Sequence, residues 1–519
     1  MELRIEAQVQ LNAENSTRTD QIARAVLLGM LFTGPALMCF AGVRAVVGDP
    51  DLGWQLSTGQ WMLQHHAFPH ADPFSRLAHG APWQAYSWLF DLILVKLYGW
   101  FGLDGIVAYT ALMVTANGIA IWRLVNRLQP DFLKSALLTL GAVFCMSRMY
   151  TPRPWLMTIF FFALELDILL RFRSSGRTRT LFWLVPLFAL WANIHIQFID
   201  GLLVLALAAS EPLIVRWLRW GKQAPAARPL WIAFGACILA TFLNPYGVAV
   251  YRSAWILGSQ PGVLNTINEM HAMAFRTDSD FVLLFLALGA AGVLFRYRNL
   301  VPFETLLLSL SAVLAFRSQR DLWMLTIVAV AILAAGIPEG AAERKPLAFW
   351  AVPIAAGLAT AVLAVAGIAM HLNNAKMAEL EAKAMPVQAV EVMQQRHYDG
   401  KIFNTYGWGG FLIWKLGEPV SIDGRAGLYG DDIIDRSMDT WAGNPKWSSN
   451  PELKSAQVVI GPVDSALTQL LLQDPRFDLA YEDDLAAVFT RHGWKPDRNG
   501  NVAALHPAGA ASAPEKHLQ

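Results

Sequence analysis

The membrane character of the chain is set by residues 23–51, ARAVLLGMLFTGPALMCFAGVRAVVGDPD. A run of mostly apolar residues, long enough to cross a bilayer, leads here directly into two acids. The residues before it, Met1 to Ile22, are polar, and no small-residue cleavage site follows the span. We therefore expect a cytoplasmic tail and a retained signal anchor, not a cleaved signal peptide.

The composition points to the same class of protein. The chain is 55% hydrophobic and 16% charged, with a mean hydropathy of +0.37, well above the range of soluble domains. A net charge of +1 leaves no basic stripe, so nucleic acid is excluded as a partner. Cys39, Cys145 and Cys237 each lie inside an apolar stretch and are expected to be small buried hydrophobic residues, not a disulfide or zinc set.

Hydropathy along the chain predicts an α-helical polytopic membrane protein with about eleven transmembrane helices. The expected spans are 23–47, 104–125, 133–150, 155–171, 180–195, 198–216, 230–247, 281–295, 300–316, 322–337 and 347–371. Lys and Arg gather in alternate connections, at 123–127, 171–179, 216–228, 296–298 and 344–345. By the positive-inside rule these connections are cytoplasmic. We expect a multi-pass protein of the bacterial inner (plasma) membrane, with its N-terminus inside and its C-terminal part in the periplasm.

One aromatic-rich stretch, 88–101 (WLFDLILVKLYGWF), is short for a span and carries Asp91 and Lys96. Counting it as a span would reverse the sidedness of every later basic loop. We interpret it as a helix that lies along the outer membrane interface, with a short re-entrant segment as the alternative.

The first outer loop, 48–87, concentrates polar chemistry. Asp49 and Asp51 follow the first span immediately, where acids are costly to desolvate and are expected to meet a cation, a proton or a polar substrate. Trp54, Trp61, Trp83 and Trp88 are either interfacial belt residues or stacking platforms for sugars. The His residues of this loop lack the spacing of a helical metal site.

Other outer turns carry arginines against the positive-inside bias, together with polar residues. Such an arginine pairs either with an internal acid or with a lipid phosphate. The groups that share this face with the first loop are Arg148, Arg153, Asn193, His195, Gln197, Asp200, Glu269, His271, Arg276, Arg317, Arg320 and Asp321. Carboxylates beside an arginine-lined phosphate site favour group transfer from a lipid-linked phosphate.

Beyond residue 371 the composition becomes that of a soluble domain, which we place at 386–492. Short apolar runs predict strands at 401–404, 419–423, 457–460, 477–481 and 486–490, with helical patterns between them, so the domain is expected to be α/β. The segment 404–430, with Trp408, Asp423 and Arg425, is interpreted either as a binding loop that faces the membrane or as a turn with an internal ion pair. The tail, 493–519, is predicted to be disordered.

These features together resemble the GT-C glycosyltransferases, and most closely bacterial members of that superfamily. The resemblance is carried by an acid just after the first span, by DPDLGWQLSTGQW (49–61), FPHADPFS (68–75), LWANIH (190–195), YGWGGFLIW (406–414) and SIDGRAGLYG (421–430). It covers most of residues 20–492. TINE (266–269) is similar to a motif of oligosaccharyltransferases, and a more distant similarity extends to protein O-mannosyltransferases.

The resemblance implies transfer of a sugar from a polyprenyl-phosphate donor to a periplasmic acceptor with inversion. It implies Asp51 as the catalytic base, with Asp49 tuning its pKa, or Asp49 itself as the base if the register is shifted. Arg153, His195, Arg317 and Arg320 are expected to hold the phosphate. Acceptor or substrate contacts are expected from Trp54, Gln55, Glu269, His271, Trp408, Asp423 and Arg425.

Two departures from the family pattern concern a metal and the acceptor. The resemblance leaves a divalent metal such as Mg²⁺ or Mn²⁺ open, with Asp51 and Glu269 as its ligands. However, a second-loop acid typical of the family is missing, and Arg153 stands near its place. YGWGG lacks the Asp of the related oligosaccharyltransferase motif, so recognition of an Asn-containing peptide is not expected, and the acceptor is a glycan, a lipid or a protein.

A second hypothesis comes from another class: a non-catalytic protein that binds, moves or scaffolds a lipid-linked glycan. A transporter is expected to place ionisable groups near the bilayer midplane and to show repeated halves. The charges here lie at one face, which favours the transferase.

Overall fold

The computed structural model describes residues 2–220, 226–260, 267–338, 350–370 and 372–496. The N-terminal part is helical throughout. Its helices are α1 (Glu2–Ala41), α2 (Val43–Val47), α3 (Leu52–His65), α4 (Trp88–Phe101), α5 (Leu103–Leu128), α6 (Phe132–Cys145), α7 (Trp155–Ser175), α8 (Leu184–Ile194), α9 (Phe198–Trp217), α10 (Ala227–Thr241), α11 (Ala249–Ser259), α13 (Asp278–Arg296), α14 (Pro302–Arg317), α15 (Leu322–Gly336), α16 (Ala351–Ala369) and α17 (Asn374–Ala382).

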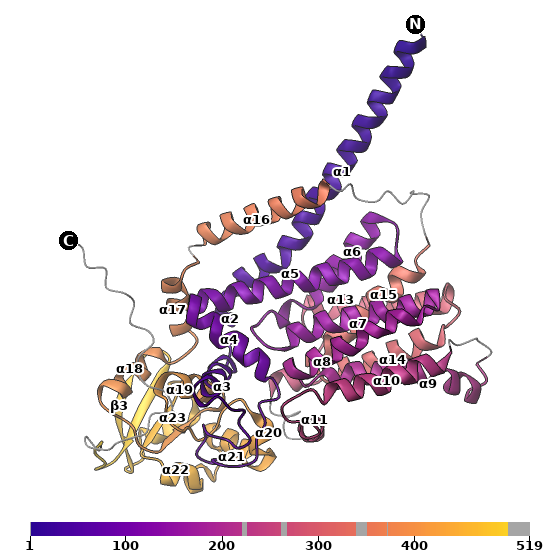
Figure 1. Ribbon diagram of the computed structural model, residues 1–519. Coiled ribbons are helices and arrows are strands. Elements are labelled where there is room, and N and C mark those ends of the chain that lie inside the picture. Colours follow the sequence, from indigo (N-terminus) through magenta and orange to yellow (C-terminus); the bar gives the residue numbers. More distant parts are fainter. Residues whose placement is uncertain (1, 221–225, 261–266, 339–349, 371, 497–519) are drawn as a thin grey trace.

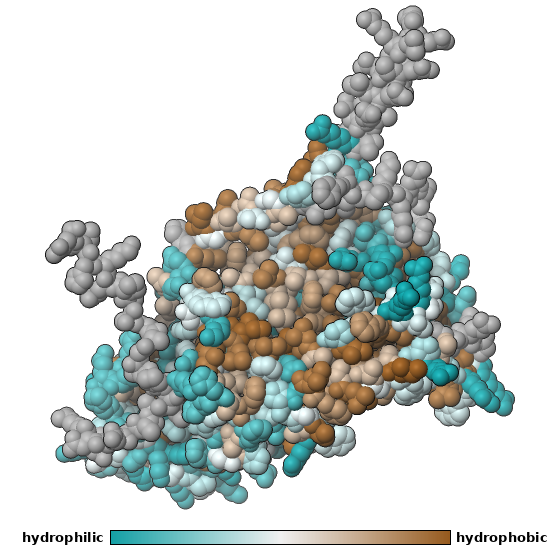
Figure 2. Space-filling model, viewed as in Figure 1, coloured by the Kyte–Doolittle hydropathy of each residue, from teal (hydrophilic) through white to brown (hydrophobic). Residues whose placement is uncertain are grey.

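Each predicted span overlaps a described helix, although 23–47 is divided between α1 and α2 and 180–195 begins in a 3₁₀ turn before α8. The protein is a multi-pass membrane protein. Five described segments are long and apolar enough by themselves to cross a membrane: Arg18–Ala41, Leu103–Leu128, Phe198–Trp217, Asp278–Arg296 and Gln319–Gly336. The centre of the bundle is α15, where every residue from Leu322 to Ala334 is buried. Apolar side chains predominate over the middle of the bundle, whereas hydrophilic ones predominate over the C-terminal part and also occur at the opposite end of the bundle (Figure 2). The three cysteines are free and buried, as expected.

The stretch predicted to be an interfacial helix forms α4, with the expected bounds. Figure 1 shows it between the bundle and the C-terminal part. It packs closely on α3, because Gly59 has no side chain: a Cβ atom there would lie 2.4 Å from the carbonyl oxygen of Asp91. One face of α4 is buried, whereas Trp100 and Phe101 at its end are exposed.

The C-terminal part is an α/β domain built on a four-stranded sheet in the order β1-β2-β4-β3. Strands β1 and β2 are parallel, and the other two pairs are antiparallel. Its elements are α18 (Val387–Gln395), β1 (Ile402–Asn404), α19 (Gly409–Leu416), α20 (Ala426–Tyr429), α21 (Asp431–Trp441), α22 (Pro451–Ser455), β2 (Val458–Pro462), α23 (Ala466–Leu471), β3 (Phe477–Glu482) and β4 (Ala486–Arg491).

Four of the five predicted strands are present, and the prediction at 419–423 was wrong. Val420 there makes one isolated bridge, to Ser75 of the first outer loop. The reason is a side chain that takes the place of a neighbouring strand: the amide of Asn404 accepts from the N–H of Ser421 at 2.9 Å and donates to the carbonyl of Ile422 at 2.8 Å. Of the tail predicted to be disordered, 497–519 lies outside the described residues, and Trp494 packs against Tyr398.

The first outer loop and the C-terminal domain share one core. Trp54, Phe74 and Trp83 of the loop pack with Leu412 and Val488 of the domain. Helix α3 packs closely on α19 where Gly53 meets Gly410. A Cβ atom on Gly53 would lie 2.2 Å from the carbonyl oxygen of Gly410. The domain therefore packs against the start of α3, next to the two acids of the first loop.

Candidate active site

The GDPD turn before α3 positions both acids. The carboxylate of Asp49 accepts the N–H of Asp51 at 2.9 Å, and its carbonyl accepts the N–H of Leu52 at 3.2 Å. Asp51 is the N-cap residue of α3, yet its side chain caps no N–H of that helix. Its carboxylate is therefore available for other contacts, and it lies against the backbone of Gly424 in the C-terminal domain, where a Cβ would be 2.2 Å from it.

Arg153, in the turn before α7, collects three carboxylates. Its Nε is 2.8 Å from Asp49, and its Nη1 is 3.0 Å from Asp51 and 2.7 Å from Glu269. Glu269 comes from a short 3₁₀ turn, Asn268–Met270. The GDPD turn and the 3₁₀ turn, which are distant in sequence, thus meet at the planar guanidinium of Arg153. Its forked N–H donors suit such an arrangement of carboxylates.

One cation facing three carboxylates leaves this cluster short of positive charge. The pKa of Asp51 is raised to about 6, mainly by burial; Asp49 and Glu269 contribute to the rise, whereas Arg153 and the Trp54 indole N–H, 3.0 Å away, act to lower the pKa. A carboxyl that titrates near neutrality is suited to accept a proton during a reaction.

A second arginine, Arg320, lies beside this cluster. Its Nη1 is 3.8 Å from Glu269, and its buried Nε has no hydrogen-bond partner among the described residues. The ring of Trp155 lies below both guanidiniums, with its centroid 4.8 Å from Arg153 and 5.7 Å from Arg320. This cation–π contact holds Arg320 in place without using its N–H groups, so it remains able to bind an anion.

His195, between α8 and α9, supports Arg320. Its Nε2 is 3.5 Å from a guanidinium nitrogen of Arg320, and its Nδ1 is 2.8 Å from the hydroxyl of Thr158. Because arginine only donates, Nε2 is assigned as the acceptor, which leaves the proton on Nδ1. The Trp191 indole N–H also bonds the Thr158 hydroxyl, at 2.9 Å. The neutral imidazole therefore orients the arginine.

These groups line one cavity of about 370 Å³. Its lining includes the predicted residues Asp51, Trp54, Gln55, Arg153, His195, Glu269, Arg320 and Arg425. Tyr406 and Gly424 of the C-terminal domain complete its wall, and the hydroxyl of Tyr406 donates to the carbonyl of Gly424 at 2.9 Å. The cavity is therefore formed jointly by the bundle, the first outer loop and the domain.

Five predicted site residues are not among the residues that line this cavity. Asp49 is buried on the far side of Arg153, and Arg317 is exposed at the end of α14. His271, Trp408 and Asp423 also lie outside the lining. The glycines around Trp408 serve packing: a Cβ on Gly410 would lie 2.7 Å from the carbonyl oxygen of Pro50.

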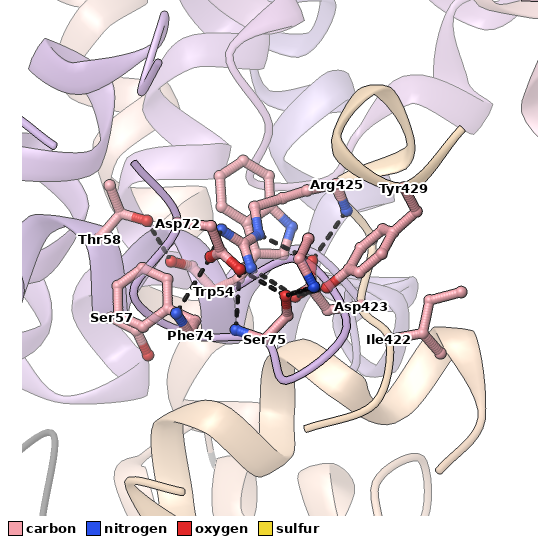
Figure 3. A network of polar contacts seen from close by, with 12 residues as sticks. Trp54, Ser57, Thr58, Asp72, Phe74, Ser75, Ile422, Asp423, Arg425 and Tyr429 are labelled. Carbon is pink, nitrogen blue, oxygen red and sulfur yellow. Dashed lines mark hydrogen bonds and ion pairs between the residues drawn. The ribbon is translucent and has the colours of Figure 1, made fainter. Parts of the chain in front are cut away.

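Arg425 and Asp423 form an internal ion network, the second of the two interpretations of this segment (Figure 3). Arg425 bonds Asp423 at 2.7 Å and Asp72 of the first loop at 2.7 Å, and lies over the rings of Phe74 and Trp83. The Tyr429 hydroxyl donates to Asp423 at 2.6 Å. The network fastens the domain to the first loop.

The residues present do not fit a divalent metal. Asp51 and Glu269, the candidate ligands, both direct an oxygen to Nη1 of Arg153, so a guanidinium occupies the place between them. Within the described ranges, no group of three His, Cys, Asp or Glu side chains is arranged to hold a metal ion.

Sequence reasoning missed several lining residues: Tyr86, Ser87, Asp91, Trp155 and Tyr406. Asp91 gave a signal, because it is an acid inside an otherwise apolar, aromatic stretch, but the sequence did not reveal that it reaches the cavity.

Another outer arginine, Arg148, has an internal partner, Asp280, and also bonds Gln319 at 2.9 Å.

The same architecture is found in solved glycosyltransferase structures. The archaeal oligosaccharyltransferase AglB from Archaeoglobus fulgidus, in complex with an inhibitory peptide and a dolichol-phosphate, is similar at a TM-score of 0.57 and 11% identity, over 86% of this chain and 70% of that one. The apo form of an oligosaccharyltransferase from the same organism gives 0.50 and 10% identity over the same shares. The chain has a GT-C fold.

ArnT from Cupriavidus metallidurans, bound to undecaprenyl phosphate, gives a TM-score of 0.45 at 14% identity, over 92% of this chain and 98% of that one. No protein-family model matches the sequence, and no curated protein matches it significantly. The two oligosaccharyltransferase structures confirm the predicted resemblance for the fold.

Proposed function

We propose that this GT-C-fold protein is a glycosyltransferase that moves a sugar from a polyprenyl-phosphate carrier to a periplasmic acceptor, with inversion. The observation that carries the proposal is the cavity in which Asp51, with its raised pKa, faces Arg153 and the incompletely paired Arg320. A base beside a cation that keeps an unpaired N–H group could accept the acceptor's proton and bind the leaving phosphate.

In the proposed reaction Asp51 accepts the proton of the acceptor hydroxyl. The acceptor oxygen then bonds to the anomeric carbon, the bond from that carbon to the phosphate oxygen breaks, and the polyprenyl phosphate leaves as an anion. A single displacement inverts the anomeric centre. Arg320 stabilises the phosphate, while Arg153 holds Asp51 and Glu269 together by pairing with both carboxylates. The negative charge of Asp49 helps to raise the pKa of Asp51.

The proposed orientation places this cavity at the periplasmic side of the bacterial inner membrane and the N-terminus in the cytoplasm. The basic residues Arg173 and Arg298, expected to be cytoplasmic, line a different cavity, of about 900 Å³. Labelling of an introduced cysteine with a membrane-impermeant thiol reagent tests this orientation. The native cysteines are buried and should not react with the reagent. In intact cells a Cys replacing the exposed Ser175 stays unlabelled; its labelling would reverse the topology.

The activity test uses purified protein in liposomes with radiolabelled undecaprenyl-phosphate hexoses. We expect sugar release by the wild type, and a loss of about 10²- to 10⁴-fold in Asp51→Asn, the usual contribution of a general base. Asp484→Asn, an exposed acid of the C-terminal domain, is the matched control and retains activity. Donor binding without turnover in all three proteins would favour a lipid-glycan binding protein instead.

A further inference from the structure

One wall of the cavity carries oxygen atoms that have no partner. The side chains of Gln55, Ser87 and Asp91 all line the cavity and are respectively 2%, 2% and 0% exposed. Gln55 Oε1, Ser87 Oγ and both carboxyl oxygens of Asp91 lack a hydrogen-bond partner among the described residues. Buried polar atoms are normally paired, so four unpaired buried oxygens in side chains of one cavity wall indicate a missing ligand.

The packing of α3 on α4 builds this wall. Gln55 follows Asp51 by one turn of α3, a rise of about 6 Å. Ser87 caps α4, and Asp91 stands one turn further along, with its N–H bonded to the carbonyl of Ser87 at 3.0 Å. Gly59, one turn beyond Gln55, allows α4 to approach at Asp91. The three side chains thus belong to one part of the cavity wall next to Asp51, and this part is called the recess.

The chemistry of this recess differs from that of the arginine end of the cavity. Burial raises the pKa of Asp91 well above its usual value, which favours the uncharged carboxylic acid. The unpaired atoms are acceptor oxygens, of which the Ser87 hydroxyl and a protonated Asp91 can also donate. Such a set matches neutral hydroxyl groups, each of which both donates and accepts. Trp83 and Tyr86 line the same cavity and offer ring faces beside it.

We propose that Gln55, Ser87 and Asp91 form a subsite that binds the hydroxyl groups of the donor's sugar, and that this subsite decides which sugars the protein accepts. The inference rests on the proposed function, because it assigns the neutral recess to the glycosyl part and the Arg320 end to the phosphate. The reacting anomeric carbon then lies between the two, close to Asp51.

The test measures lipid affinity with the full-length protein in nanodiscs. The probes are undecaprenyl phosphate and its glucosyl, mannosyl and galactosyl esters. In the wild type we expect at least one ester to bind about tenfold more tightly than the bare phosphate, as two or more satisfied hydrogen bonds would give. Asp91→Leu abolishes this preference while its affinity for the bare phosphate is unchanged.

Asp91→Asn is the matched variant, because the amide keeps the shape and the hydrogen-bonding capacity of the side chain. It is expected to retain most of the preference for the sugar ester, so a loss seen only in Asp91→Leu is assigned to the missing hydrogen bonds. Gln55→Leu weakens the preference independently. Equal affinities for all four lipids in the wild type, or a full preference kept by Asp91→Leu, would overturn the subsite alone. Binding of none of the four lipids would overturn the proposed function and the subsite together.

Discussion

Two arginine–carboxylate clusters lie at the junction of the bundle, the first loop and the C-terminal domain. They differ in how completely their charged groups are paired. Arg425 is 5% exposed, and its guanidinium is shared by Asp423 and Asp72. Around Arg153, by contrast, three carboxylates compete for one guanidinium, and Arg320 beside them keeps an unpaired Nε. The closed network is suited to hold the fold, and the open one to bind and react.

Removing the arginine of the open cluster has the largest expected effect on activity. Arg153→Met leaves Asp49, Asp51 and Glu269 to repel one another, so we expect the transfer rate to fall about 10²-fold or more. Arg153→Lys restores little of it, because an ammonium cannot bond three carboxylates in one plane. The rate of sugar transfer in liposomes measures this. A fully active lysine variant would show that the forked geometry is unimportant.

Removing an acid of the closed network affects stability instead. Asp423→Ala leaves the buried charge of Arg425 short of a partner, and breaking such a pair costs about 3–5 kcal/mol. Asp51→Asn removes a carboxylate whose burial already disfavours its charge, so it does not lower stability. The unfolding temperatures of the two variants in detergent would separate them. If Asp51→Asn destabilised as much as Asp423→Ala, the contrast between the clusters would be lost.

The raised pKa of Asp51 predicts a pH dependence of the reaction. A base must be ionised to accept a proton, so kcat/KM falls as the pH drops below about 6, approaching tenfold per unit, and is constant above it. A pH profile between 5 and 8 measures this on the acidic side. An Asp51→Glu variant with residual activity would show a displaced midpoint, whereas the same midpoint would assign the titration to another group.

The smallest expected effect is that of a chelator. Because Arg153 stands between the carboxylates of Asp51 and Glu269, EDTA should leave the rate unchanged, and added Mg²⁺ or Mn²⁺ should not raise it. Inhibition by EDTA that Mn²⁺ reverses would show that the arginine moves aside for a metal.

The sequence predicted the helices well and the detailed contacts less well. Long apolar runs identify membrane helices because every backbone group in lipid must be bonded internally. Asp51, Arg153, Glu269 and Arg320 were predicted to share a site because all lie at the same membrane face. Their pairing was not predictable, since it depends on turns such as GDPD and TPRPW that bring distant segments together.

The C-terminal segment and the recess show where pattern alone is insufficient. The apolar run 419–423 has strand composition, but the side chain of Asn404 replaces the strand partner. Asp91 was noticed as a charge in α4, but its access to the cavity depends on the contact of Gly59 with its backbone. Such contacts between helices leave no periodic trace in the sequence.

In the proposed site Arg320 binds the lipid phosphate, and two arginines three residues apart provide a direct test. Arg320 lines the cavity, whereas Arg317, at the same turn, is exposed. The measurement is the affinity of each variant for undecaprenyl phosphate in nanodiscs. We expect Arg320→Gln to weaken binding about tenfold or more, the loss of a charge-assisted hydrogen bond, and Arg317→Gln to bind like the wild type. Equal affinities for both variants would show that Arg320 does not bind the phosphate.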